Sequence, residues 1–121
     1  MRKEQRLRTT RDFVAARATR SAWTDRVLVL YARANGLDVT RFGFSVGRRV
    51  GGAVRRNEIK RRLRAVASQT PVDNGWDVVV IARKGATDAD FRVLKASLDA
   101  LLLRAGLRTS FIGAPVSDMG T

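Results

Sequence analysis

The stretch from Ser45 to Val66 reads SVGRRVGGAVRRNEIKRRLRAV and combines a helical periodicity with a high density of positive charge. At about 100° per residue, the helix expected from about Val54 to Ser68 has one apolar side. Its members are Ile59, Leu63, Val66 and Ala67. The opposite side carries Asn57, Lys60, Arg61 and Arg64. We therefore expect one side of this helix to pack against a sheet and the other to present an almost purely cationic surface.

The residues just before this helix extend the same pattern. Gly51 and Gly52 break the chain and leave a backbone that a phosphate could approach at the helix start. Arg48 and Arg49 stand at the end of the preceding strand and are expected to enlarge the cationic surface. Arg56 would point toward the apolar side if it lay within the helix. We therefore expect it in the opening turn, where it could reach outward.

The charge of the whole chain is concentrated in the same way. The 121 residues include 24 Lys and Arg against 11 Asp and Glu, which gives a formal net charge of +13. Residues 1–20 carry +5 and residues 41–64 carry +8, whereas residues 21–40 and 65–121 are neutral. Surfaces that are charged only for solubility intersperse both signs. The pattern therefore indicates a folded protein with a polyanionic partner.

The composition excludes several classes of enzyme and compartment. The chain has no histidine and no cysteine, which excludes a zinc site of thiolates and imidazoles, a Cys nucleophile, a Ser-His-Asp triad and a disulfide framework. No apolar run approaches the roughly 18 to 20 residues that span a bilayer, and the N-terminus lacks a secretory signal. We expect a cytoplasmic protein with one domain over residues 1–121, with mobile tails at residues 1–8 and 113–121.

The remaining patterns predict an α+β fold, a two-layer α-β sandwich with a small mixed sheet. The predicted elements are a helix from Thr9 or Thr10 to about Arg20, strands over Val27–Ala32, Arg41–Gly47 and Asp77–Ala82, the basic helix, and a last helix ending at Gly106. Thr87 with Asp90 three residues on resembles a capping box that opens this last helix. The strand Asp77–Ala82 is continuously apolar and is expected to be buried on both faces.

The strand from Arg41 to Gly47 alternates sharply. Its larger side chains, Phe42, Phe44 and Val46, fall on one face. The other face carries only Gly43, Ser45 and Gly47. Small residues there permit another group to approach the backbone closely.

A cationic helix face is often merely a solvated surface, and basic amphipathic helices also bind anionic membranes. Nine basic residues and one acidic residue in the 24 positions 41–64 argue against the first reading. The apolar side of the helix contains no Trp or Phe and is needed to cover the sheet, which argues against the second. Nucleic-acid binding is the reading that the residues favour.

The basic helix carries a specific resemblance to a known protein family. Residues 52–64, GAVRRNEIKRRLR, resemble the signature of the bacterial ribonuclease P protein component, an Arg-Asn pair followed by Ile-Lys-Arg and a further Arg. The resemblance covers nearly the whole chain. It includes Asp12-Phe13 in the first helix and three strand motifs, which are Val29-Leu30-Tyr31, Phe44-Ser45-Val46 and Val80-Ile81-Ala82-Arg83.

The resemblance implies a small protein that binds a large catalytic RNA and assists Mg²⁺-dependent removal of the 5′ leader from precursor tRNA, with Mg²⁺ held mainly by the RNA. It also implies a left-handed strand–helix–strand crossover, although such crossovers are usually right-handed. The resemblance implies that the catalytic RNA is bound by Arg49, Arg56, Asn57, Lys60, Arg61 and Arg64. The charge pattern adds Arg48 to this set. No catalytic residue, protein-bound metal, membrane, DNA or obligate protein partner is expected.

For the leader, the resemblance implies a cleft on the sheet that contains Phe13 and Tyr31. The chain departs from the family pattern at two positions. Glu58 replaces a basic residue, so we leave it out of the binding set. Arg17 stands where many members have a second aromatic residue, and we include it in the cleft as a phosphate contact. Core packing of Phe13 and half-burial of Tyr31 in the sheet are the structural alternatives.

Two other functions remain as alternatives. One is a ribosomal or structural RNA-binding protein that uses the same helix without a catalytic partner. The other is an autonomous nuclease whose candidate metal ligands are Asp77, Asp88, Asp90 and Asp99. We favour it least, because Asp88 and Asp90 are explained as residues of a helix start and no two-metal motif is present.

Overall fold

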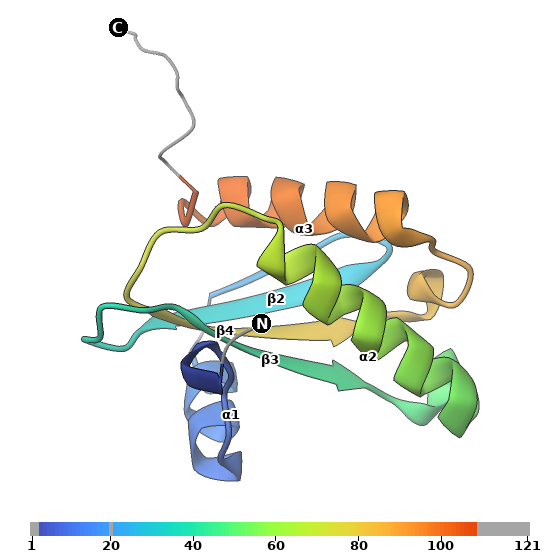
Figure 1. The fold of residues 1–121 in the computed structure, drawn as a ribbon, viewed down its shortest axis with the longest axis horizontal. Helices are drawn as coiled ribbons and strands as arrows, with labels where there is room; N and C mark the ends of the chain where they lie inside the picture. The colour runs from blue at the N-terminus through green and yellow to red at the C-terminus, as the bar shows by residue number, and fades with distance from the viewer. Residues whose placement is uncertain (1–2, 20, 109–121) are drawn as a thin grey trace, which may run out of the picture.

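Four strands form one mixed sheet, in the order β1-β2-β4-β3, in the computed structural model, which describes residues 3–19 and 21–108 (Figure 1). In chain order the elements are η1 (Lys3–Gln5), α1 (Thr10–Arg17), β1 (Ala22–Thr24), β2 (Leu28–Ala34), β3 (Arg41–Val46), η2 (Arg48–Val50), α2 (Ala53–Ser68), β4 (Trp76–Ala82), η3 (Lys84–Ala86) and α3 (Phe91–Arg104). The α+β prediction with a small mixed sheet is confirmed.

β4 is the centre of the sheet, because it pairs antiparallel with β2 and parallel with β3. Its residue Val80 lies between Leu30 of β2 and Phe44 of β3. Val78, Val79 and Val80 are completely buried. The continuous apolar run therefore corresponds to a strand covered on both faces, as predicted. α2 connects the parallel neighbours β3 and β4, so the strand–helix–strand unit is present; the handedness of its crossover stays a prediction.

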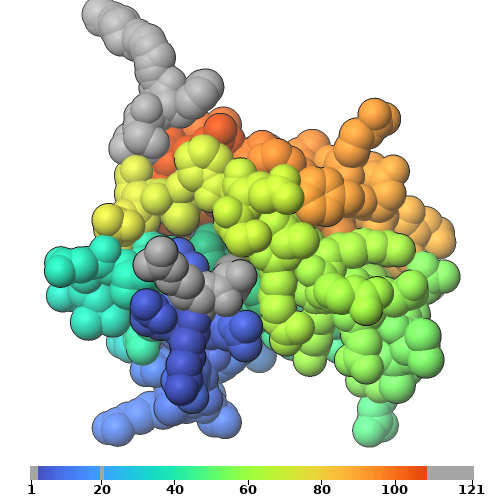
Figure 2. Space-filling view, viewed as in Figure 1, coloured from blue at the N-terminus to red at the C-terminus, as the bar shows by residue number. Residues whose placement is uncertain are grey.

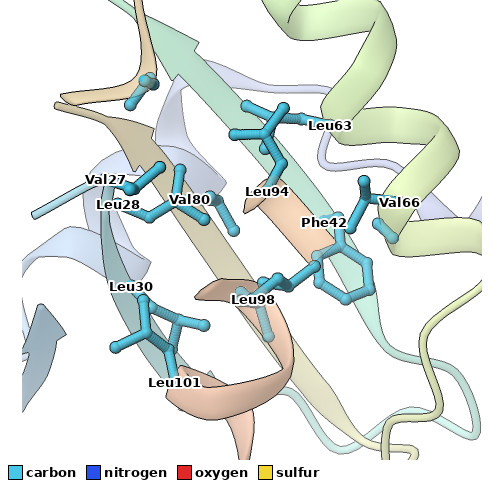
Figure 3. Packing of buried hydrophobic residues seen from close by; sticks show 14 of the residues in the cluster. Val27, Leu28, Leu30, Phe42, Leu63, Val66, Val80, Leu94, Leu98 and Leu101 are labelled. Atoms are coloured by element: carbon cyan, nitrogen blue, oxygen red, sulfur yellow. The ribbon is translucent and has the colours of Figure 1, made fainter. Parts of the chain in front are cut away.

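The two faces of the sheet are covered unequally. Alternate residues of β2, β3 and β4 point toward α2 and α3, where Leu30, Val80, Leu63 and Leu98 belong to one large apolar core (Figure 3). Among the described residues, the opposite face carries the short helix α1 (Figure 1) and a small cluster of Leu7, Ala16 and Val79. The sheet therefore has a closed face that stabilises the fold and a second face that α1 covers in part.

Residues 3–8, which belong to the segment predicted as a mobile tail, contact the sheet. Leu7 is buried, and its backbone N–H donates to the carbonyl oxygen of Phe42 at 2.8 Å. Arg6 forms an isolated parallel bridge with the same residue. Residues 3–8 therefore lie along the edge of β3, because Leu7 fills the small cluster beneath α1. The second predicted tail, residues 113–121, lies outside the described residues.

Three element boundaries also differ from prediction. α1 ends at Arg17 rather than near Arg20. α3 is capped by Asp90, whose side chain accepts a hydrogen bond from Val93 N, and not by Thr87. The Thr87 hydroxyl instead lies within hydrogen-bonding distance of the carbonyl oxygens of Val50 and Lys84, where it joins η2 to η3. The short edge strand β1 has no counterpart among the predicted elements. Over the described ranges, no helix combines the length and apolarity that a bilayer crossing requires.

Candidate nucleic-acid interface

α2 has the amphipathic character that its sequence predicts. Its four predicted apolar residues, Ile59, Leu63, Val66 and Ala67, are all buried. On the other side, Asn57, Arg61 and Arg64 are exposed and Lys60 is partly exposed. These four side chains, called the α2 cationic face below, lie on a helix that runs across one side of the molecule (Figure 1).

No acidic side chain of the described residues pairs with the α2 cationic face. The one acidic residue of the helix is Glu58, whose Oε1 lies 3.9 Å from Arg55 Nη1. Arg62 is turned toward the start of α3, where its Nη1 donates to the carbonyl oxygen of Ala89 at 3.4 Å. Because the charges of the face are not neutralised within the protein, a polyanion would relieve their mutual repulsion.

Arg56 lies in the first turn of α2. The helix begins at Ala53, and the backbone N–H of Arg56 donates to the carbonyl oxygen of Gly52 at 2.9 Å. Its side chain is half-buried. Its Nε is buried without a hydrogen-bond partner among the described residues. Arg56 therefore lies in the opening turn, where the sequence places it, and its contact with the catalytic RNA stays a prediction.

A second cationic surface lies at the ends of the two parallel strands. A cavity of about 590 Å³ opens where β3 and β4 end. Five basic residues line this strand-end groove: Arg17, Arg48, Arg49, Arg83 and Lys84. Arg48 and Arg49 are exposed in η2, as expected for an extension of the basic surface. No acidic residue is among the lining residues, so the groove suits an anionic ligand.

Arg83 and Lys84 are members of this groove that the sequence analysis missed. They directly follow β4, just as Arg48 and Arg49 follow β3 after Gly47. Parallel neighbours end at the same edge of a sheet, so this matching position was the available signal. Arg83 Nη1 donates to Thr24 Oγ1 at 3.1 Å and to the carbonyl oxygen of Asp25 at 2.8 Å. These acceptors are uncharged, and the arginine keeps its full positive charge in the groove.

The Phe13 side chain is partly packed against the sheet and partly exposed. Its ring rests against Gly43, where a Cβ would come within 2.4 Å of the ring atom Cζ. The small face of β3 therefore accommodates Phe13, which is itself half-buried against the cluster of Leu7, Ala16 and Val79. The exposed part of the ring lines a cavity of about 410 Å³ between α1, β3 and α2. The surface is indented between α1 and α2 in Figure 2.

Tyr31 packs against the same small cluster from β2 but lines a different cavity, of about 310 Å³. Arg17 lines that cavity, the Phe13 cavity and the strand-end groove. It is exposed at the last turn of α1, and no ion pair with another described residue holds it. The predicted leader residues thus lie along one side of the sheet, with Arg17 at the junction of the three hollows.

Beneath α1, a buried carboxylate organises the other end of this face. Asp77 is fully buried on β4 and is the register partner of Arg33 on β2 and of Arg41 on β3. Arg41 donates to it through Nε and Nη2, each at 2.8 Å, and Asn35 Nδ2 donates at 2.9 Å. Arg33 Nη2 lies 3.7 Å away.

The pKa of Asp77 reflects this environment. Burial alone raises the pKa, because it penalises the charged form. The hydrogen bonds from Arg41 and Asn35, with the positive charges of Arg41 and Arg33, outweigh burial and hold the pKa below its ordinary value. Both carboxylate oxygens of Asp77 are engaged by Arg41, Asn35 and Arg33, so this side chain is an ion-pair partner within the sheet.

The other candidate metal ligands also have structural roles or lie apart. Asp90 caps α3. Asp99 lies 3.5 Å from Lys95 and 2.9 Å from Arg108. Within residues 3–19 and 21–108, no group of three or more acidic side chains gathers in a way that could hold a metal ion. The carboxylates of these residues do not fit a protein-held Mg²⁺ site.

Comparison with known proteins gives a consistent result. Residues 1–106 match the sequence model of the family described as Ribonuclease P. A ribonuclease P protein component of Roseiflexus sp. (strain RS-1) is 40% identical over an alignment of 124 positions, gaps included. This alignment covers 99% of this chain and 100% of that protein. One from Syntrophomonas wolfei is 36% identical over 107 residues, which cover 87% of this chain and 90% of that protein.

Solved structures agree with the sequence relatives. The structure of the Staphylococcus aureus RNase P protein matches with a TM-score of 0.75 and 30% identity, over 85% of this chain and 96% of that chain. The RNase P protein from Thermotoga maritima matches with a TM-score of 0.72 and 34% identity, over 82% of this chain and 96% of that chain. The likeness therefore extends to the whole arrangement of helices and strands.

Proposed function

Because the chain belongs to the family of bacterial ribonuclease P protein components, we propose that it binds the catalytic RNA subunit of ribonuclease P and the 5′ leader of precursor tRNA. In this role it assists the endonucleolytic removal of the leader, which gives the mature 5′ end of tRNA. It contributes electrostatic and stacking contacts, and the RNA subunit carries out the chemistry.

The observation that carries the proposal is the unneutralised α2 cationic face. Lys60, Arg61 and Arg64 stand on one side of a helix whose other side is fixed in the core. Each cation placed against a phosphate releases condensed counterions, which makes binding strong at low salt and steeply salt-dependent. Asn57 adds donors and an acceptor to the same side. We assign this face to the catalytic RNA.

The face of the sheet that carries α1 suits a single strand. Its hollows combine two aromatic side chains, Phe13 and Tyr31, with the cation of Arg17. Single-stranded nucleic acids are commonly held by stacking on aromatic rings within a positively charged groove. We assign the 5′ leader to this surface. The strand-end groove adjoins it through Arg17, and we keep Arg48 and Arg49 of this groove in the set that binds the catalytic RNA.

Mg²⁺ belongs to the RNA side of this proposal. The carboxylates of the described residues are used in ion pairs and helix caps or stand apart, and they do not form a Mg²⁺ site. We therefore propose that the RNA subunit holds the metal ions of the reaction, and we assign no catalytic step to a residue of this chain.

Reconstitution tests this function directly. The purified protein alone should leave precursor tRNA intact, and it should accelerate cleavage at the mature 5′ end when the RNA subunit from the same organism is added at physiological Mg²⁺. A ribosomal or structural RNA-binding protein would use the same cationic face but would not stimulate cleavage. An unchanged cleavage rate would therefore refute the proposal.

Substitution of Tyr31 tests the assignment of the leader. Tyr31→Ala should weaken the binding of precursor tRNA to the reconstituted complex by about 1 kcal/mol, at the low end of the stacking range because the ring is half-buried. The affinity for mature tRNA should stay unchanged. Tyr31→Phe, which keeps the ring, is the matched control. Equal losses for precursor and mature tRNA would assign Tyr31 a purely structural role.

A further inference from the structure

We propose that Asp12 is a positioning residue, which fixes α1 on the sheet through Arg33 and Arg41 and thereby sets the shape of the leader-binding surface. The proposal rests on the proposed function, because it concerns the surface assigned to the leader. Asp12 itself lines none of the hollows of that surface. Its effect on the leader is therefore exerted through the placement of α1.

The first step is the contact that Asp12 makes. Its carboxylate lies 3.5 Å from Arg41 Nη1 and 3.9 Å from Arg33 Nη2. Both arginines are on strands that flank Asp77, which binds Arg41 through two hydrogen bonds and lies close to Arg33. Exposed ion pairs contribute little, partly because two flexible side chains must be ordered. Here the buried carboxylate of Asp77 has already ordered Arg41, which reduces that entropic cost.

The second step is the weakness of the other contacts of α1. The helix has eight residues, and Ala16 is its only buried residue in the structure described. Helices of this length are not stable alone in water, so their position depends on tertiary contacts. The other apolar anchor within the helix is Phe13, seated on Gly43. A single row of two apolar residues leaves rotation about the helix axis poorly fixed.

The third step is the arrangement of residues around α1. At about 100° per residue, Asp12 and Phe13 lie on either side of Ala16, so the ion pair and the ring hold the helix from two sides. Val14 and Arg17 lie farther around, beyond Phe13, where they line the cavities of the leader surface. Rotation of α1 after loss of the Asp12 contact would therefore displace Arg17 from the junction of the three hollows.

The sign of the effect separates positioning from simple electrostatics. Asp12→Asn removes a negative charge from a protein that binds a polyanion, so electrostatics alone predicts tighter binding of the leader. Positioning predicts weaker binding, by about three- to tenfold, which lies within the range for residues that modulate binding without touching the ligand. Asp38→Asn is the matched control, since Asp38 is exposed in the loop between β2 and β3 and has no ion pair with another described residue.

The experiment measures the affinity of the reconstituted complex for precursor tRNA and for mature tRNA, with wild type, Asp12→Asn, Asp38→Asn and Asp12→Glu. We expect Asp12→Asn to lose the leader-dependent part of the affinity and to keep its affinity for the RNA subunit. Asp12→Glu, which restores the carboxylate, should recover part of the loss. Precursor binding by Asp12→Asn that equals or exceeds that of Asp38→Asn would overturn the proposal.

An NMR measurement on the protein alone distinguishes a failure of the Asp12 proposal from a failure of the leader assignment. The Phe13 ring lies over Gly43, so the Hα resonances of Gly43 should carry a ring-current shift in NMR spectra. Asp12→Asn should reduce this shift, whereas Asp38→Asn should not. An unchanged Gly43 shift in Asp12→Asn would refute the positioning role even if the protein binds leaders. A lack of leader preference in the wild-type complex, with a changed shift, would instead refute the leader assignment.

Discussion

Replacement of Gly43 by alanine should destabilise the protein, because the Phe13 ring occupies the space that the new methyl group needs. A Cβ on Gly43 would lie 2.4 Å from Cζ, 2.7 Å from Cε1 and 2.9 Å from Cε2 of this ring. Carbon atoms in contact are ordinarily about 3.5 to 4.0 Å apart. The ring, and α1 with it, would have to withdraw from β3 by about 1 Å.

Overpacking of this kind costs about 1–3 kcal/mol. With a urea m-value of about 2 kcal/mol per molar, a loss of 2 kcal/mol lowers the unfolding midpoint by about 1 M. Equilibrium urea unfolding followed by circular dichroism measures this shift. Gly47→Ala is the matched control, because no heavy atom lies within 4 Å of its Cβ position and its φ of −80° suits alanine. Its midpoint should stay unchanged or rise slightly.

A double-mutant cycle separates the proposed clash from a general sensitivity of β3. Removal of the ring in Phe13→Ala should make the additional change Gly43→Ala nearly harmless, so the double variant is more stable than the sum of the single effects predicts. Residues in contact typically couple by about 0.5–3 kcal/mol. A Gly43→Ala midpoint equal to that of Gly47→Ala, or strictly additive effects of Gly43→Ala and Phe13→Ala, would refute this account of α1 packing.

Two further predictions concern charge. If Arg61 contacts a phosphate, Arg61→Ala should reduce the slope of log Kd against log salt for the RNA subunit by about 1. The control Arg92→Ala, on the exposed side of α3, should leave this slope unchanged. Equal slopes for both variants would remove Arg61 from the contact set. The second prediction concerns acid stability: the folded pKa of Asp77 is below its unfolded value, so its stabilisation is present above about pH 4 and is lost as the pH falls through the folded pKa. The free energy of unfolding should therefore decrease less between about pH 5 and pH 2 in Asp77→Asn than in wild type, as urea titrations at each pH can measure; an identical decrease would assign the acid sensitivity to other groups.

The sequence was most informative where a pattern depends on local chemistry alone. The helical periodicity of Ile59 and Leu63 predicts the buried side of α2, and the apolar run after Asp77 predicts a strand covered on both faces; both are confirmed. The strand β1 was missed because Ala22–Thr24 is too short to show alternation, and it forms through pairing with β2.

The sequence did not determine the contacts of residues whose neighbours are set by the order of the strands. The sequence offers Asp77 as a candidate metal ligand, whereas its role as an ion-pair partner follows from its register opposite Arg33 and Arg41 on its two neighbouring strands. That register requires β4 to insert between β2 and β3, which no local pattern specifies. The small face around Gly43 was likewise predicted to admit a close neighbour, but only the fold identifies that neighbour as Phe13.

Insertion of β4 between β2 and β3 also determines when the protein can fold during its synthesis. β2 and β3 are adjacent in the chain but do not pair with each other, because β4, which is translated after α2, lies between them. Pairings of this kind join residues that are distant in sequence and are slow to form. The sheet cannot close until residue 82 has left the ribosome, and the arginine-rich segment emerges first, without the core that later holds its apolar side. A nascent chain of this protein therefore presents its most basic segment as unfolded polypeptide, next to ribosomal RNA, before it has a tertiary structure.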